Sequence, residues 1–143
     1  MFTYALANIL QKGSRILAID KSIVILKLLA NPNNIVIDTQ QLDFTKSALP
    51  IDKLDGILMA NSLHFVADKK SFIASAGTKL SNDGVFLIAE YDTDTANQWV
   101  PHPASAHTLQ SLFKEAGYHS FIKTGEIKSM YNTGNIYAAM IKK

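Results

Sequence analysis

Short apolar runs that each end in polar residues alternate with helix-like segments, and this alternation constrains the fold more than any other feature of the sequence. The runs are residues 15–20 (RILAID), 35–37 (IVI), 54–61 (LDGILMAN) and 85–91 (VFLIAEY). Nearly uninterrupted apolar runs of strand length are typical of parallel strands that are covered on both faces. The sequence therefore predicts an α/β fold in which a mostly parallel sheet has helices on both faces.

Helical spacing of apolar residues occurs between these runs. Phe2, Leu6, Ile9 and Leu10 share one face of a predicted helix that ends before Gly13. Further helices are predicted at residues 21–30 (KSIVILKLLA), 68–80 and 105–118 (SAHTLQSLFKEAGY), a turn at residues 81–84 (SNDG), and two final strands at residues 119–123 and 135–141. The chain thus reads as an alternation of helices and strands that closes with a pair of strands.

Composition narrows the class of protein. With 143 residues, of which 48% are hydrophobic, the chain is long enough for one domain, predicted to span residues 1–143. The 14 basic and 12 acidic residues are scattered and sum to a charge of +2, so neither nucleic acid nor a membrane is predicted as a partner. The absence of cysteine excludes disulfides and thiolate chemistry and fits a cytoplasmic protein.

Two acidic residues follow the first two strand-like runs, at the positions where ligands of open parallel sheets bind. Asp20 has the acceptor atoms to bind both hydroxyls of a ribose, but it equally suits the cap of the helix predicted from Lys21. Asp38 is placed to accept from the exocyclic amine of an adenine while the Thr39 N–H donates to a ring nitrogen, and its alternative is an ordinary turn residue. Both alternatives remain open from the residues alone.

Polar residues also follow the two later runs. Asn61 and Ser62 are candidates for holding the polar tail of a ligand, although both are common in turns. His64 is a candidate general base, since imidazole changes charge near neutral pH, or a structural residue packed beside its apolar neighbours. The irregular stretch 91–103 carries Trp99 and is predicted to be a substrate lid or a cover for the core edge.

Other motif classes argue against several functions. Asp92, Asp94 and His102 lie in one loop, but their spacing fixes no geometry, and no metal site is predicted. The sequence contains no G-x-x-x-x-G-K-[ST] phosphate loop, no G-x-S-x-G nucleophile elbow and no H-E-x-x-H pair. Kinase and hydrolase activities are therefore not expected.

Taken in order, the segments RILAIDKS, IDTQQLDF, LDGILMANSLHFVAD, GVFLIAEYDTD and LQSLFKEAGY, followed by two C-terminal strands, resemble the Rossmann-like core of class I S-adenosylmethionine-dependent methyltransferases. The resemblance implies that Asp20 binds the cofactor's ribose, with Lys21 beside it. It also implies adenine contacts by Asp38, Thr39 and Gln40, and it places Asn61, Ser62 and Leu63 near the methionine portion and the transferred methyl group.

The sequence departs from this family at its N-terminus. The family begins with a strand that leads into a glycine-rich acidic loop and then into the helix equivalent to FTYALANIL, whereas Met1 falls about where that loop would finish. We therefore expect the first strand to be missing and cofactor binding to be weakened. In the family's order 3-2-1-4-5-7-6 that strand is central, so we expect strands 2 and 4 to pair directly, or a second copy of the chain to supply the pairing.

The predicted activity is methyl transfer from S-adenosylmethionine to a small-molecule acceptor by in-line displacement. This chemistry depends on positioning and on excluding water, so it requires no dedicated triad. His64 or His102 would deprotonate the acceptor, and Tyr91 and Trp99 would belong to the substrate lid. The alternatives left open are a catalytically inactive remnant of the fold that acts as a homodimeric interaction module, and an adenosyl-binding module without transfer.

Overall fold

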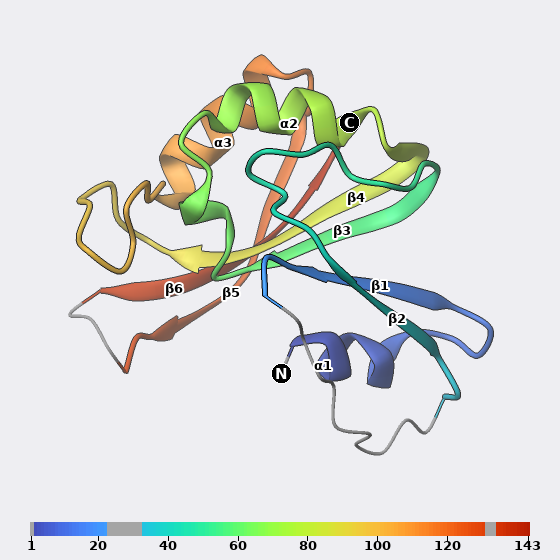
Figure 1. Cartoon of the computed structure of the whole chain (residues 1–143). Helices are drawn as coiled ribbons and strands as arrows, with labels where there is room; N and C mark the ends of the chain where they lie inside the picture. Colours follow the sequence, from blue (N-terminus) through green and yellow to red (C-terminus); the bar gives the residue numbers. More distant parts are fainter. Residues whose placement is uncertain (1, 23–32, 131–133) are drawn as a thin grey trace. The chain divides into compact units, whose positions relative to one another are not determined.

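The computed structural model describes residues 2–22, 33–130 and 134–143 (Figure 1). In chain order the elements are α1 (Phe2–Ile9), β1 (Arg15–Asp20), β2 (Val36–Gln41), β3 (Leu54–Ala60), the 3-10 helix η1 (Leu63–Phe65), α2 (Lys69–Gly77), β4 (Leu80–Tyr91), α3 (Ala106–Glu115), β5 (Ser120–Lys128) and β6 (Asn135–Lys142). The chain divides into two compact units, Met1–Ser47 and Ala48–Lys143, which are described separately. The helix predicted at residues 21–30 lies largely outside the described residues, and the single-domain organisation stays a prediction.

The first unit contains α1 and the parallel pair β1–β2, which runs in register from Arg15 opposite Val36 to Asp20 opposite Gln41. Its small core consists of Ala7, Ile16 and Ile35, with Leu6, Leu10 and Ile37 packed around them. The predicted N-terminal helix is confirmed. Its buried face is centred on Ala7, and Leu6 and Leu10 of the predicted apolar face pack against the core, whereas Phe2 and Ile9 are exposed. Ile9 is 76% exposed and Phe2 is 44% exposed.

The second strand of this unit is longer than predicted. It extends to Gln41, so Asp38 and Thr39 lie within β2, opposite Leu17 and Ala18, and do not follow the strand's end. The prediction of a strand that stops at Ile37 is wrong because main-chain pairing to β1 continues past the apolar residues. Polar side chains do not interrupt such a ladder.

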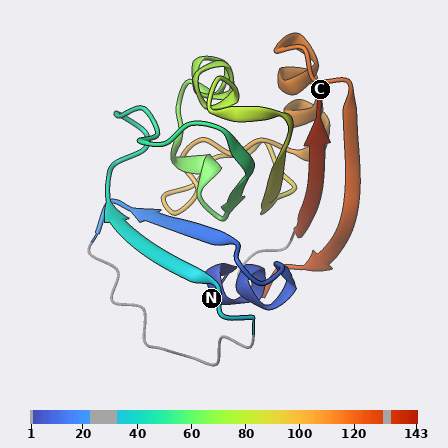
Figure 2. The same ribbon diagram turned by 90° about the vertical axis from the view of Figure 1, so that its right-hand side faces the viewer.

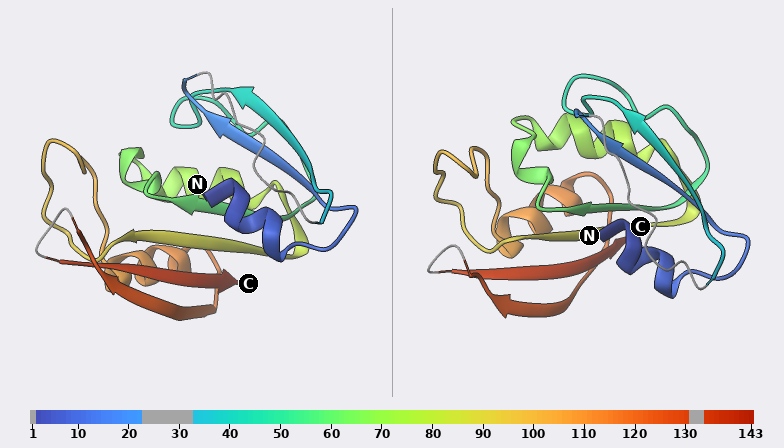
Figure 3. Two further views of the ribbon diagram at one scale, coloured as in Figure 1. Left: turned by 90° about the horizontal axis from the view of Figure 1, so that it is seen from below. Right: turned by 60° about the horizontal axis from the view of Figure 1, so that its bottom comes forward.

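The second unit contains a four-stranded sheet in the order β3-β4-β6-β5. β3 and β4 are parallel, and β6 is antiparallel to both of its neighbours (Figure 2). β5 therefore runs in the direction of β4 and forms one edge of the sheet (Figure 3). The predicted α/β class with a mostly parallel arrangement is confirmed.

The strand order within each unit corresponds to a part of the expected order 3-2-1-4-5-7-6. In the first unit β2-β1 corresponds to strands 3-2, and in the second unit β3-β4-β6-β5 corresponds to strands 4-5-7-6. Among the described residues β1 is hydrogen-bonded only to β2, and β3 only to β4. Direct pairing of strands 2 and 4, which belong to different units, and pairing supplied by a second copy both stay predictions.

Helices α2 and α3 cover the sheet face that carries Phe86 and Ile88 (Figure 1). Phe86, Phe113 and Tyr118 pack edge to face, with ring centroids 5.0 to 5.5 Å apart. Such aromatic pairs contribute about 0.5–1.5 kcal/mol each beyond the area they bury. The core of this unit therefore lies between this face of the sheet and the two helices.

Local signals explain the ends of these helices. Asp68 caps α2 by accepting from the Ser71 N–H at 3.0 Å, and Ser105 caps α3 by accepting from the Thr108 N–H at 3.2 Å. Gly117, whose φ is +86°, follows α3 in the left-handed conformation that ends many helices. Both helix predictions are confirmed. Among the described residues no helix combines the length and apolarity needed to cross a membrane.

The turn predicted at residues 81–84 is wrong, because these residues belong to β4. The ladder between β3 and β4 shifts register between Leu54 and Gly56, which accommodates the extra residues as an irregularity of the strand. A Cβ at Gly84 would lie 2.8 Å from the main-chain oxygen of Leu54. Glycine at this position therefore allows close packing of β4 against β3, where a turn before the strand was predicted.

Candidate active site

The carboxyl ends of β3 and β4 lie side by side, because the two parallel strands are paired up to Ala60 opposite Ala89. The Asn61 N–H extends this pairing with a 2.8 Å hydrogen bond to the main-chain oxygen of Ala89. Asn61 has a φ of +50°, a left-handed conformation that asparagine tolerates better than most residues. It turns the chain from β3 toward η1, so the predicted residues Asn61, Ser62 and Leu63 lie together at this edge.

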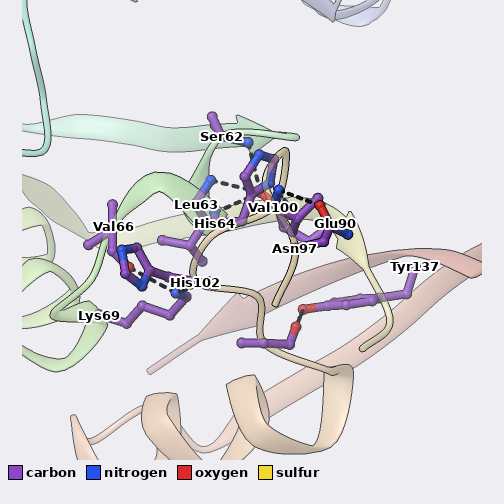
Figure 4. A network of polar contacts seen from close by, with 11 residues as sticks. Ser62, Leu63, His64, Val66, Lys69, Glu90, Asn97, Val100, His102 and Tyr137 are labelled. Carbon is purple, nitrogen blue, oxygen red and sulfur yellow. Dashed lines mark hydrogen bonds and ion pairs between the residues drawn. The ribbon is translucent and has the colours of Figure 1, made fainter. Parts of the chain in front are cut away.

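Glu90, near the end of β4, is a buried carboxylate at the same edge. Its side chain lies on the same face of β4 as those of Phe86 and Ile88, which is the face that the helices cover, and Glu90 is 4% exposed. Its Oε1 accepts the N–H groups of Ser62 and Leu63, each at 2.7 Å (Figure 4). Ser62 makes no side-chain cap for η1, so the carboxylate of the neighbouring strand satisfies the free N–H groups of this short helix.

The side chain of His64 is hydrogen-bonded to Glu90. Its Nδ1 lies 2.8 Å from Glu90 Oε2, and the imidazole is 5% exposed (Figure 4). The ring centroid lies 4.3 Å from that of Phe65 and 6.0 Å from that of Tyr91. The His64 ring thus packs against two aromatic rings and is hydrogen-bonded to a carboxylate. Such a hydrogen bond orients the imidazole in histidines that transfer protons. Its role as a general base stays a prediction.

Lys69, the first residue of α2, is hydrogen-bonded to the loop between β4 and α3 beside this site. Its buried Nζ donates to the main-chain oxygens of Val66, at 2.9 Å, and of His102. Burial lowers the pKa of Lys69, and the negative charge of Glu90 acts in the opposite direction. Because the His102 N–H also donates to the His64 oxygen at 3.0 Å, His102 contributes its main chain to the site. As a residue it is exposed, and catalysis by its imidazole stays a prediction.

The loop between β4 and α3 is anchored by its carboxylates. Asp92 accepts from the Ala106 N–H at 2.8 Å, and Asp94 accepts from the N–H and hydroxyl of Ser105, each at 2.8 Å. The Ser105 N–H lowers the pKa of Asp94. These carboxylates therefore hold the start of α3.

Trp99 lies in the same loop and is 76% exposed, whereas Val100 beside it is 3% exposed. The core is covered by Val100, so the alternative in which Trp99 covers the core edge is wrong. Tyr91, the last residue of β4, is half-buried. The membership of Tyr91 and Trp99 in a substrate lid stays a prediction.

In the first unit Asp20 is the last residue of β1, as predicted, and is exposed. Its Oδ1 accepts from the Ser22 N–H at 2.8 Å, a local turn that uses one carboxylate oxygen. The Asp38 carboxylate forms a 2.9 Å ion pair with Arg15. Both residues predicted to contact the adenosyl group therefore already have a partner among the described residues.

The other predicted residues of this unit lie next to Asp20. Thr39 and Gln40 are exposed and pair with Ala18 and Ile19 of β1. Lys21 is also exposed, and its main-chain oxygen accepts from the Gln41 amide at 3.1 Å. Parallel pairing thus brings the predicted ribose and adenine residues to neighbouring strands.

Sequence reasoning did not select Glu90 or Lys69 as site residues. A signal for Glu90 exists, because the alternation in VFLIAEY places it in phase with Phe86 and Ile88 on the buried face. Lys69 has no comparable signal. Its partners are main-chain oxygens, which every residue type has, so the sequence does not indicate these contacts.

The parallel strands β3 and β4, with polar residues at their carboxyl ends, have the arrangement in which open α/β sheets generally bind ligands. A family model described as a methyltransferase domain matches residues 2–88. The chain belongs to this family, the class I S-adenosylmethionine-dependent methyltransferases. None of the curated proteins matches the sequence.

Several solved structures share the fold at low sequence identity. A Leishmania major S-adenosylmethionine-dependent methyltransferase is similar with a TM-score of 0.56 and 15% identity, over 74% of this chain and 46% of the other. A Burkholderia thailandensis 1,6-didemethyltoxoflavin-N1-methyltransferase, solved with 1,6-didemethyltoxoflavin and S-adenosylhomocysteine, has a TM-score of 0.67 and 16% identity, over 92% and 62%. The DhpI complex with S-adenosylhomocysteine has a TM-score of 0.66 and 17% identity, over 97% and 70%. The chain thus spans less than two thirds of the first two proteins, at 46% and 62% of their lengths.

Proposed function

We propose that this chain transfers the methyl group of S-adenosylmethionine to a small-molecule acceptor, and that His64 is the base that removes the acceptor's proton. The observation that carries the proposal is the buried pair of His64 and Glu90, 2.8 Å apart, at the carboxyl ends of two parallel strands in a methyltransferase domain. A buried carboxylate and imidazole are costly to place in a core without a function, so their position beside the polar edge supports a chemical role.

The residues at this edge fit the methionine part of the cofactor. Asn61 Oδ1 is buried and has no hydrogen-bond partner among the residues that the structure describes. An unsatisfied buried acceptor costs about 1–3 kcal/mol, which a donor such as the ammonium group of the cofactor would recover. In the first unit Asp20 and Asp38 each use one carboxylate oxygen, and among the described residues the second oxygen of each has no donor, so it can accept from a hydroxyl or an amine.

When bound, S-adenosylmethionine supplies the methyl group, which its sulfonium sulfur releases to an attacking oxygen or nitrogen. His64 would take the proton of that oxygen or nitrogen on Nε2, since Nδ1 is directed at Glu90. The carboxylate of Glu90 would stabilise the imidazolium that results. Acceptors with a weakly acidic O–H or N–H group gain most from such a base.

A second candidate is an adenosyl-binding or homodimeric interaction module without catalysis. The engagement of Asp20 by Ser22 and of Asp38 by Arg15 favours the interaction module, because these contacts must be shared when a ribose and an adenine bind. The interaction module predicts weak ligand binding or none, whereas the adenosyl-binding module predicts binding without methyl transfer. In the homodimeric form the interaction module also predicts a molecular mass of twice that of the chain.

The first test is isothermal calorimetry with S-adenosylmethionine and S-adenosylhomocysteine, with the mass in solution measured on the same sample. Micromolar affinity, about −8 kcal/mol, supports the methyltransferase. Transfer is then assayed by mass spectrometry on a panel of small phenols and amines. Absence of binding in a folded sample rejects the proposal in favour of the interaction module.

His64→Gln tests the base. We expect unchanged affinity for S-adenosylhomocysteine and a turnover lower by about 10² to 10⁴, the usual contribution of a general base. His107→Gln is the matched control, because His107 is exposed on α3. Equal turnover of the two variants would show that His64 is structural.

A further inference from the structure

We propose that Glu90 is a positioning residue that fixes the tautomer of His64, with the hydrogen on Nδ1 and the lone pair on Nε2. Its catalytic consequence rests on the proposed function, but the tautomer itself is a property of the folded chain. The proposal stands on the geometry of one buried carboxylate whose two oxygens have different partners.

The Oε1 atom of Glu90 accepts hydrogen bonds from main-chain N–H groups. It accepts N–H groups from Ser62 and Leu63 at 2.7 Å, and a longer contact of 3.4 Å comes from the His64 N–H. These donors belong to one turn, and a main-chain N–H cannot become an acceptor. The orientation of the Glu90 side chain is therefore set before the imidazole is considered.

The Oε2 atom faces His64 Nδ1 at 2.8 Å in a site where both side chains are about 95% buried. An ionised carboxylate only accepts, so the hydrogen between them belongs to Nδ1. In the neutral ring the lone pair then lies on Nε2. The main-chain turn after β3 thus selects the nitrogen that is basic.

Glu90→Gln separates this role from the capping of η1. The three N–H groups at the Oε1 position require an acceptor, so the amide oxygen of glutamine must occupy it. The amide nitrogen is then placed at the Oε2 position and donates to Nδ1. The substitution keeps the shape and the cap of the turn but moves the ring hydrogen to Nε2.

The experiment is imidazole ¹⁵N NMR on the cofactor-free chain, at a pH where the rings are neutral. The 4 histidines of the sequence provide one test ring and three internal controls, namely His102, His107 and His119. We expect the Nδ1–H tautomer for His64 in the wild type and the Nε2–H tautomer in Glu90→Gln. Glu115→Gln, which changes a 56% exposed carboxylate on α3 in the same way, is expected to leave His64 unchanged.

The Nε2–H tautomer in the wild type, or an unchanged His64 in a folded Glu90→Gln chain, would overturn the proposal. The wild-type spectrum decides the first point by itself, so a variant that does not fold leaves the proposal falsifiable. If the proposed function also holds, Glu90→Gln lowers turnover by about 10² to 10⁴ and leaves the affinity for S-adenosylhomocysteine unchanged. A correct tautomer in a chain that binds no cofactor would reject the function and retain this inference.

Discussion

Replacing Lys69 with methionine tests how much its hydrogen bonds stabilise the loop between β4 and α3. Lys69 Nζ donates to two main-chain oxygens, those of Val66 and His102, and the residue is 7% exposed. Hydrogen bonds to a charged group contribute about 1.5–3 kcal/mol each, and relief from burying the ammonium offsets part of the loss. We therefore expect Lys69→Met to lower the free energy of unfolding by about 2–4 kcal/mol, measured by urea denaturation.

Lys70→Met is the matched control, because the adjacent lysine forms a surface ion pair with Glu115 in which the two side chains are 69% and 56% exposed. Such pairs contribute about 0–1 kcal/mol. Hydrogen exchange gives a local readout: the His102 amide, bonded to His64, should exchange faster in Lys69→Met, while the Leu109 amide at the start of α3 should not. Equal destabilisation by both substitutions would refute the reasoning.

Two further predictions concern the same unit. Burial raises the pKa of Tyr137 above its ordinary 10.0, with smaller contributions from nearby carboxylates, so the folded state keeps a proton that the unfolded state loses. The stability that this proton provides is present below pH 10.0 and is lost as the pH rises further. The stability difference between the wild type and Tyr137→Phe, followed by urea denaturation, should therefore narrow above that pH, and a constant difference would contradict the assignment. Gly84→Ala should destabilise by about 1–3 kcal/mol because the new Cβ would lie 2.8 Å from the main chain of β3, whereas Gly125→Ala, with no atom within 4 Å of its Cβ, should change the unfolding midpoint little. Equal midpoints for the two alanine variants would show that the strands adjust to the added carbon.

Local periodicity was sufficient to predict the elements that bury an apolar face. The helices α2 and α3 and the strand β3 follow from the spacing of apolar side chains within short segments. The same local reasoning failed at β2 and at residues 81–84. There, pairing with a neighbouring strand extends the ladder through polar residues and glycine.

The candidate positions at the strand ends follow from the residue types alone. Asp20 ends β1, and Asn61, Ser62 and His64 follow β3, because a parallel strand of apolar residues ends where polar residues begin. The contacts that these residues make depend on how the strands pair in the folded chain. His64 and Glu90 are 26 positions apart, and the pairing of β3 with β4 is what brings them within 2.8 Å. The physical reason is that a buried carboxylate takes its donors from the segment packed beside it. Here these donors are the N–H groups of Ser62 and Leu63 and the imidazole of His64, and the residue types alone do not encode their proximity to Glu90.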